Sequence, residues 1–545
     1  MLNIHQRYCK ETFFNGELDR FETVCPPDFN FAYDVVDEIA KAEPQRRAML
    51  WCNTRGEEKT FSFSDFQRYS NKTANMLRSH GIGRGDKVLL IMKRHYEFWF
   101  TVLALHKLGA IGIPATNLLT KKDLVFRFNA AEVKGVVCTT DGEVIEHVEK
   151  SLPESPTVQV KVSVKGKRDG WIDFTEEVEK APDQLERVET KATDTMLIYF
   201  TSGTSGMPKM VAHDFAYPLG HIVTAKYWQN VRPDGLHLTV SDSGWMKCMW
   251  GKLYGQWLME AGIFVYDYDK FVPDELLRLF AKYKITTFCA PPTIYRFFIK
   301  EDLSHYDLSS LTYACIAGEA LNPEVYEQFR KATGLKLMEG FGQTETTLTV
   351  LNKVGMTPKP GSMGKPSPAY QMEIVDENDQ PVSPGQVGEI VVRTGNHKPD
   401  GMFFEYYKDP EATKRAWHDG LYHTGDTAWR DEDGYFWYVG RTDDIIKSSG
   451  YRIGPFEIES VLIEHPSVLE CAVTGVPDPI RGQVVKATIV LARGYEPSEA
   501  LKKEIQDHVK RQTAPYKYPR IVEFVPELPK TISGKIRRVE IRENN

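Results

Sequence analysis

The chain has 545 residues, 41% of them hydrophobic and 26% charged, which is typical of a globular protein with three or four structural units. A net charge of −7 and a pI of about 6.1 argue against a nucleic-acid-binding protein, which is usually basic. No apolar run is long enough to span a bilayer, and the first 20 residues lack the apolar stretch of a signal peptide. We therefore expect no nucleic-acid partner, no membrane span and a cytoplasmic location. The eight cysteines form no CxxC pair and no cluster with histidine, so we expect buried free thiols.

Apolar strand-like runs alternate with helical patterns from the N-terminal region to about Ser362. The predicted strands are residues 87–92, 111–116, 133–139, 195–200, 262–267, 285–290 and 311–318, and the predicted helices are residues 96–110, 273–283 and 323–333. Pro273 and Pro323 stand in the first turns of their helices, where proline is favoured. This alternation predicts an α/β fold with parallel β-sheets covered by helices.

The pattern changes after Ser362. Residues 371–395 contain Asn-Asp and Pro-Gly turns between apolar runs, which predicts a hairpin-rich, β-barrel-like segment of the large domain. Residues 433–465 predict two short strands and then a helix from about Pro455. After them we expect strands near 470–478 and 484–493, a helix over 498–512 and a last strand after 520. We place a boundary at Gly440–Asp444, between an N-terminal domain of residues 1–440 and a small mobile α+β domain of residues 441–545.

A loop rich in glycine and hydroxyl side chains follows the predicted strand 195–200. Its nine residues, "TSGTSGMPK", run from Thr201 to Lys209. Glycines let backbone N–H groups converge on an anion, and the lysine adds charge, which is typical of a phosphate-binding loop. The spacing from Gly203 to Lys209 does not fit the GxxxxGK[ST] pattern, and no helix follows at once, so a Walker A loop is excluded. A solvated Ser/Gly turn is the alternative.

Five further motifs follow in order: "GEAL" at 318–321, "EGFGQTET" at 339–346, "YHTGD" at 422–426, "GRTDDIIKSSGYRIGPFEIE" at 440–459 and "PKTISGKIRR" at 529–538. Together with the glycine-rich loop, they resemble the adenylate-forming superfamily of acyl-CoA synthetases, peptide-synthetase adenylation domains and luciferases. The residues of these motifs are most similar to those of medium-chain and short-chain acyl-CoA synthetases. The resemblance implies that a carboxylic acid reacts with ATP to form an acyl-adenylate and diphosphate, and that coenzyme A then takes the acyl group and releases AMP.

The resemblance also implies roles for single residues. Thr344 and Arg441 would contact the phosphates or ribose, Glu345 would hold Mg²⁺, and Asp426 would accept the ribose hydroxyls. Lys535 would be the catalytic lysine, which stabilises charge at the α-phosphate. The residues expected to bind ATP or AMP are Thr201, Ser202, Gly203, Thr204, Ser205, Gly206, Met207, Pro208, Lys209, Gly318, Glu319, Ala320, Glu339, Gly340, Phe341, Gly342, Gln343, Thr344, Asp426, Arg441, Arg452 and Lys535.

The second half-reaction needs a coenzyme A site, which the resemblance places on the C-terminal domain. The expected residues are Ser449, Gly450, Tyr451, Arg481, Tyr518, Pro519 and Arg520. Asp443 at the domain boundary is the expected hinge, which would let one domain present first Lys535 and then the "SGYR" loop. Surface charge is the alternative for Arg481.

The acyl pocket is predicted at Gly342, Trp245 and Trp257, with Trp250 as a further tryptophan of the same segment. Acetyl-CoA synthetases carry a tryptophan where this chain has Gly342, so the glycine would open space for a longer acid. The tryptophans could equally be core residues. Two other functions are weighed: an aryl-acid CoA ligase of the same superfamily, and a catalytically silent nucleotide-binding homologue. Retention of Lys535, Glu345 and Asp426 argues against the silent homologue.

Overall fold

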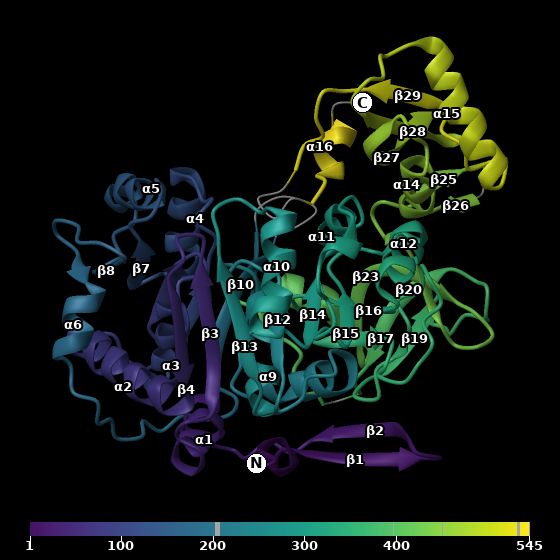
Figure 1. Ribbon diagram of the computed structural model, residues 1–545. Helices are drawn as coiled ribbons and strands as arrows, with labels where there is room; N and C mark the ends of the chain where they lie inside the picture. Colours follow the sequence, from purple (N-terminus) through teal and green to yellow (C-terminus); the bar gives the residue numbers. More distant parts are fainter. Residues whose placement is uncertain (202–207, 396, 450, 531–534, 544–545) are drawn as a thin grey trace.

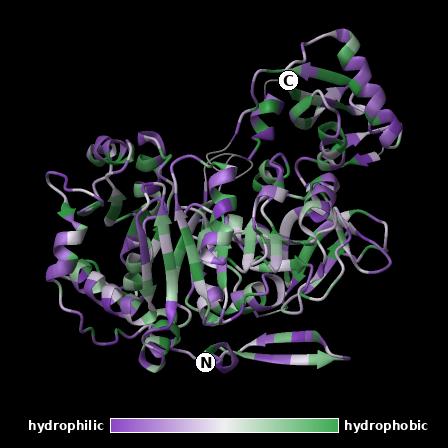
Figure 2. Cartoon of the chain, in the orientation of Figure 1, coloured by the Kyte–Doolittle hydropathy of each residue, from purple (hydrophilic) through white to green (hydrophobic). Residues whose placement is uncertain are grey.

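The computed structural model describes residues 1–545 except 202–207, 396, 450, 531–534 and 544–545. Two large parallel-type sheets lie side by side in the N-terminal part, and a smaller lobe from the last hundred residues stands above them (Figure 1). The strands of the large sheets are mostly hydrophobic, whereas the outer helices carry hydrophilic stripes (Figure 2). Sheets covered on both faces are expected to have such continuous apolar strands.

The first large sheet has eight strands and carries the glycine-rich loop between β10 and β11. Its order is β21 (Glu405–Tyr406), β11 (Lys209–Asp214), β10 (Thr195–Thr201), β6 (Ile111–Pro114), β5 (Lys87–Ile91), β7 (Gly135–Thr139), β8 (Val160–Val164) and β9 (Ile172–Asp173). The strands from β10 to β9 are parallel, and β11 and β21 are antiparallel additions at one edge.

The second large sheet has nine strands. Its order is β18 (Lys365–Pro366), β17 (Leu348–Leu351), β16 (Leu337–Gly342), β15 (Tyr313–Ile316), β14 (Thr287–Ala290), β12 (Leu236–Thr239), β13 (Gly262–Asp267), β3 (Arg47–Asn53) and β4 (Glu58–Ser62). Six strands, from β16 to β3, are parallel, and the outer pairs are antiparallel. The predicted parallel sheets are confirmed.

Helices cover both large sheets. In the N-terminal part they are α1 (Glu38–Ala42), α2 (Phe63–Ser79), α3 (Glu97–Leu108), α4 (Lys121–Ala131), α5 (Val144–Ser151), α6 (Phe174–Lys180), α7 (His221–Val223), α8 (Met246–Gly251), α9 (Tyr254–Leu258), α10 (Pro273–Tyr283), α11 (Pro292–Phe298), α12 (Pro323–Thr333) and α13 (Pro410–Ala416). The predicted bounds of α10 and α12 are confirmed to the residue. In α12, Asn322 accepts from the Glu324 N–H at 2.8 Å and Gly334 ends the helix at φ 75°, so both ends are capped.

A five-stranded antiparallel sheet follows in the segment expected to be hairpin-rich. Its strands are β19 (Gln371–Val375), β20 (Gly388–Arg393), β22 (Trp417–His418), β23 (Leu421–Arg430) and β24 (Phe436–Arg441). β23 lies between β20 and β24, and its middle carries the "YHTGD" motif. The motif therefore lies inside a paired sheet, where neighbouring strands fix its side chains.

The C-terminal lobe is a second five-stranded sheet with its own helices. It comprises β25 (Ile446–Ser448), β26 (Tyr451–Ile453), β27 (Val468–Asp478), β28 (Gly482–Leu491), β29 (Ile521–Phe524), α14 (Pro455–Ile463), α15 (Glu499–Gln512) and α16 (Arg538–Glu543). A separate hydrophobic cluster, with buried members from Ile446 to Val522, forms its core. A short hairpin of β1 (Cys9–Phe14) and β2 (Glu17–Thr23) lies at the opposite end of the molecule (Figure 1). Across the described ranges, no helix combines the length and the apolar character that a bilayer crossing requires.

Candidate active site

The β10–β11 hairpin brings the ends of the glycine-rich loop together. Thr201 and Lys209 are directly paired across the two strands, so the two ends of the loop lie opposite each other. The loop residues Ser202, Gly203, Thr204, Ser205, Gly206 and Met207 lie outside the described residues. Pro208 precedes Lys209, whose ammonium lies 4.7 Å from the centre of the Tyr406 ring on the neighbouring strand β21. The hairpin therefore presents one cation beside this ring.

Thr344 and Glu345 lie in the connection between β16 and β17, next to the same hairpin. The Thr344 carbonyl accepts a hydrogen bond from Nε2 of buried His213 at 2.7 Å. Tyr406 donates its hydroxyl to Oε1 of Glu345 at 2.9 Å. Burial raises the pKa of the Glu345 carboxyl, while Tyr406 and the positive charges of Arg441 and Lys209 oppose that shift. The connection is thus anchored to β11 and β21, and it holds a sequestered carboxylate among cations.

Glu345 fits the role of a magnesium ligand. Mg²⁺ prefers oxygen ligands and usually binds through one or two carboxylates together with substrate phosphates. Oε1 of Glu345 is shared with the Tyr406 hydroxyl, and the facing hairpin belongs to the loop that would hold phosphates. A single carboxylate beside a phosphate-binding loop is the donor set that such an ion uses.

Asp426 on β23 lies at the centre of a second group of polar contacts. Its carboxylate accepts from Nε2 of Gln343 at 2.5 Å, from the Tyr438 hydroxyl at 3.1 Å and from Nη1 of Arg441 at 3.4 Å. Burial raises the pKa of the Asp426 carboxyl, and the charges of Arg441 and Lys535 oppose that shift. Tyr422 holds the other end of the Gln343 amide with a hydrogen bond of 2.8 Å. The motif residues Gln343, Asp426 and Arg441 are therefore assembled into one network.

Lys535 acts on two groups of the large domain. Its positive charge opposes the upward pKa shift that burial causes at Asp426. At Lys247 on α8 it adds to the downward pKa shift, for which burial is the larger cause. The C-terminal lobe is therefore oriented with Lys535 toward the nucleotide motifs. Lys247 was missed by sequence reasoning; its ammonium donates to the Ala317 carbonyl at 2.6 Å, immediately before Gly318. The sequence did contain a signal for this residue, because Lys247 lies between Trp245 and Trp250 in an otherwise apolar segment.

Two of the segments expected to bind ATP or AMP, residues 318–320 and 339–342, are only partly exposed. Gly318 has φ +114° and leads into a turn that also contains Glu319 and Ala320, which are not buried. Glu339 is buried, and burial raises its pKa to about 8; its Oε1 accepts from the Leu321 N–H. Gly340 packs against Trp228 and Leu348, whereas Phe341 is half-buried. Of the second segment, Phe341 and Gly342 are the members that a ligand can reach.

The expected acyl pocket needs correction. A Cβ at Gly342 would lie 2.3 Å from the Thr347 carbonyl oxygen, so this glycine permits a close backbone approach rather than opening a tunnel. Trp257 is fully buried, packs against Phe63 and Phe66, and donates to the Ala48 carbonyl at 3.1 Å, which makes it a core residue. Trp245 is half-buried before α8, and Trp250 is a buried neighbour of Trp228. Trp245 and Trp250 remain predictions for the pocket.

The expected coenzyme A residues lie on the C-terminal lobe. Ser449 and Arg481 are joined by a bond from Nη1 of Arg481 to the Ser449 hydroxyl of 3.2 Å, and Tyr451 stacks on Tyr516 at 4.0 Å. Arg520 donates to the Tyr518 hydroxyl at 3.0 Å, and the Pro519 carbonyl accepts from Gln506 at 3.0 Å. Gly450 lies outside the described residues. The exposed side chains among them are Ser449, Tyr451, Arg481 and Arg520, whereas Tyr518 is half-buried and Pro519 is buried.

Arg452 and Asp443 occupy the region between the two domains. Arg452 was expected to face the nucleotide; in this orientation of the lobe its guanidinium pairs with Glu377 in the turn between β19 and β20, and its role at the nucleotide stays a prediction. Asp443 directly follows Arg441 and Thr442, and its carbonyl accepts from Nη1 of Arg542 at 3.2 Å. The carboxylate of Asp444 lies between Arg542 and Arg538 of α16. The segment that links β24 to the C-terminal lobe is therefore held by contacts with α16.

The sequence pattern of the AMP-binding enzyme family matches residues 36–407, and that of the AMP-binding enzyme C-terminal domain matches residues 457–535. The first match alone covers more than half of the chain, and the chain therefore belongs to the AMP-binding enzyme family. The resemblance found from the six motifs is confirmed.

Two curated relatives indicate the class of enzyme within this family. The acyl-coenzyme A synthetase ACSM4, mitochondrial, of Mus musculus is 44% identical over 536 residues, which cover 96% of this chain and 92% of the relative. The acyl-coenzyme A synthetase ACSM3, mitochondrial, of Pongo abelii is 43% identical over 532 residues, 96% of this chain and 90% of the relative. These names confirm the expected enzyme class. The word mitochondrial in them overturns the expected cytoplasmic location.

A solved structure supports the fold assignment. The anthranilate CoA ligase AuaEII in complex with anthranoyl-AMP superposes with a TM-score of 0.87 at 29% identity, covering 95% of this chain and 98% of the ligase. A benzoate CoA ligase from Burkholderia xenovorans, at 24% identity and a TM-score of 0.81, shares the fold over 94% of this chain. The α/β architecture with a small C-terminal lobe is thus the fold of acid–CoA ligases.

Proposed function

We propose that this protein is an AMP-forming acyl-CoA synthetase acting on short-chain, medium-chain or branched carboxylic acids. The observation that carries the proposal is the meeting of the separated motifs: Asp426 shares a hydrogen-bond network with Gln343 and Arg441. Glu345 and Lys209 lie beside that network, joined through Tyr406. One acidic ribose acceptor, one candidate metal ligand and three cations suit ATP and an anionic acid.

The first half-reaction joins two anions. A carboxylate oxygen of the acid attacks the α-phosphorus of ATP, the bond from that phosphorus to the bridging oxygen breaks, and diphosphate leaves. Lys535, Lys209 and Arg441 would stabilise the charge that develops, and Asp426 would orient the ribose. Mg²⁺ held by Glu345 would supply a Lewis acid at the phosphate oxygens.

The second half-reaction needs no protein nucleophile. The thiol sulfur of coenzyme A attacks the acyl carbon, the bond to the AMP oxygen breaks, and the thiol proton is lost. We propose that residues 441–545 rotate about Asp443 to bring Ser449, Tyr451 and the adjoining loop to the acyl group. The separate core of the C-terminal lobe supports rotation as one body. Arg481 and Arg520 offer exposed guanidinium groups for the coenzyme, and Tyr518 beside them is half-buried. Arg441 ends β24, so the proposed pivot at Asp443 lies just beyond the antiparallel sheet.

Diphosphate release measured with acetate through decanoate, with and without coenzyme A, tests the proposal. We expect adenylation of at least one acid and coenzyme-dependent formation of AMP. Aromatic acids belong in the same panel, because the structural relative AuaEII is an anthranilate CoA ligase. Turnover of aromatic acids only would replace the proposal with an aryl-acid ligase. No diphosphate from any acid would indicate a silent homologue.

A further inference from the structure

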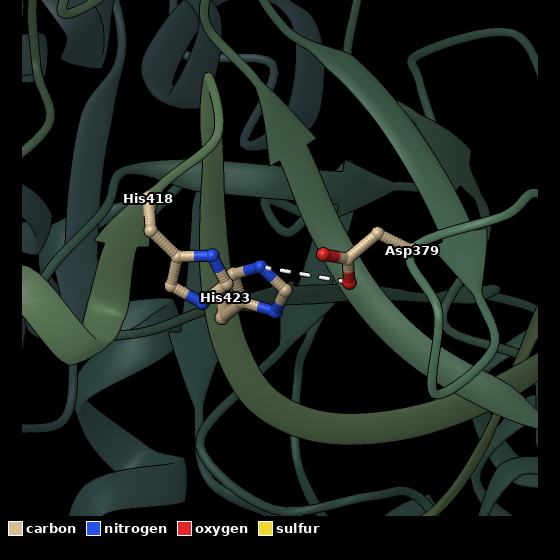
Figure 3. A group of neighbouring side chains, drawn as sticks. All are labelled: Asp379, His418 and His423. Atoms are coloured by element: carbon tan, nitrogen blue, oxygen red, sulfur yellow. Dashed lines mark ion pairs between the residues drawn. The ribbon is translucent and has the colours of Figure 1, made fainter.

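Two histidines and an aspartate from separate turns meet on the antiparallel sheet. Asp379 lies in the turn between β19 and β20, His418 ends β22, and His423 lies on β23 (Figure 3). One ligand atom from each residue lies within 4.8 Å of the others, and the two imidazole rings stack at 4.1 Å. His418 and His423 are five residues apart in the sequence, whereas Asp379 lies 39 residues before His418, so only the folded sheet brings the three together.

The hydrogen bonds of His423 prepare one of its nitrogens for a ligand. Nδ1 lies 3.2 Å from Oε2 of Glu389 on β20 and donates to it. In the neutral imidazole Nε2 therefore carries the lone pair; this atom is buried, has no hydrogen-bond partner among the described residues and lies 3.8 Å from Oδ1 of Asp379 (Figure 3). Metal-binding histidines typically donate their second N–H to a carboxylate in this way.

The ligand atoms of the three side chains are close enough to surround a metal ion after small side-chain movements. Zinc–nitrogen bonds of about 2.0–2.1 Å place tetrahedral ligand atoms about 3.4 Å apart. The side chains of Asp379 and His418 are 34% and 39% exposed and can turn inward, whereas His423 is only 12% exposed and stays fixed. One ordered imidazole and two adjustable ligands at the surface can therefore accommodate a metal ion.

We propose that Asp379, His418 and His423 form a site for a divalent transition-metal ion of the Zn²⁺ class. Two imidazole nitrogens with one carboxylate suit such ions, and solvent would complete the coordination. This site is separate from Glu345, which offers the oxygen ligand that Mg²⁺ prefers.

The site is joined to functional segments through two contacts. Glu389, which holds Nδ1 of His423, also accepts from the N–H of Gly425 at 2.8 Å, next to Asp426. The turn that carries Asp379 also carries Glu377, the partner of Arg452 in the C-terminal lobe. A bound ion would therefore fasten the β19–β20 turn to β23, beside the ribose acceptor and at the edge of the domain interface.

Calorimetric titration of Zn²⁺ into the metal-free full-length protein tests the site. We expect one equivalent to bind, and we expect His418→Ala and Asp379→Asn each to weaken binding at least about tenfold, the lower end of what even outer partners of metal ligands cost. His305→Ala is the matched control, because His305 is an exposed imidazole 3.5 Å from Asp302 without a second histidine beside it. It should bind like the wild type.

Cobalt provides an independent readout of ligand identity. The visible bands of bound Co²⁺ should indicate nitrogen and oxygen ligands, without a thiolate-to-cobalt charge-transfer band from the protein's cysteines. The proposal is overturned if no equivalent binds, if both substitutions leave the affinity unchanged, or if the cobalt spectrum shows thiolate ligation. Two independent variants preserve the test if one of them fails to fold.

Discussion

Asp426 and Arg441 face each other across β23 and β24, with Nη1 of Arg441 lying 3.4 Å from Oδ2 of Asp426. Arg441 is also the last residue of β24, after which the chain crosses to the C-terminal lobe. The residue proposed to contact the nucleotide is therefore two positions from the proposed hinge. Under the proposed function, nucleotide binding and movement of the lobe would therefore both act on this short segment.

Lys535→Ala is expected to stop adenylation while sparing thioester formation from a supplied acyl-adenylate. The charge of Lys535 reaches Asp426 in this orientation of the lobe, and a preorganised donor at the transition state contributes on the order of 3 kcal/mol, or about 100-fold in rate. Single-turnover assays of each half-reaction measure this difference. Lys530→Ala is the control, since Lys530 pairs with Glu470 within the lobe. Equal loss of both half-reactions would show that Lys535 does not serve the first step alone.

Asp443→Pro is expected to slow one half-reaction much more than the other. Proline fixes φ and removes the N–H, so it restricts the backbone change that a hinge requires. Asp443→Ala keeps the backbone free and serves as the control for loss of the side chain, which lies 3.7 Å from Nε of Arg441. Transient kinetics of adenylation and thioester formation distinguish the two variants. Wild-type rates for both steps in the proline variant would place the hinge elsewhere.

Gly342→Ala is expected to depress kcat/KM for every acid to a similar extent. The added Cβ would lie 2.3 Å from the Thr347 oxygen and would displace the connection that holds Thr344 and Glu345. A displacement near 1 Å can cost on the order of 100-fold in rate. Gly83→Ala is the control, because its nearest neighbour to an added Cβ is 4.0 Å away. A loss confined to long acids in a chain-length series would instead restore Gly342 to the acyl pocket.

Glu339→Gln is expected to stabilise the ligand-free protein above pH 5. The pKa of Glu339 is raised to about 8, so the stability that it contributes is full below its unfolded pKa near 4.5 and is lost as the pH rises through 8. A neutral amide does not titrate, and the advantage of the variant should reach about 3 kcal/mol at pH 7. Chemical denaturation of both proteins at pH 5 and pH 8 measures the change. A pH-independent difference would mean that Glu339 is not held protonated.

The sequence was sufficient for the strands and helices with strong local signals. Proline at the first turn and apolar periodicity placed α10 and α12, and parallel strands appeared as continuous apolar runs. The motif order also identified the family. These features are local, so one segment at a time is enough to recognise them.

The acyl pocket could not be predicted in the same way. Trp257 and Trp250 look alike in sequence, and only the packing of Phe63 and Phe66 shows that Trp257 belongs to the core. The need for glycine at 342 comes from the carbonyl of Thr347, a contact made by the bend between two strands. The pairing of Arg452 with Glu377 depends on the orientation of the lobe, which no local pattern determines.

Helix α16 has a practical consequence for work with this protein. Arg538 and Arg542 on this helix hold Asp444, and Arg538 is only three residues after Lys535. The helix therefore connects the proposed hinge region to the proposed catalytic lysine. An affinity tag fused after α16 could disturb the contacts of this helix with Asp444. A tag at the N-terminus would lie at the far end of the molecule (Figure 1). Kinetic constants should therefore be measured on protein purified through an N-terminal tag.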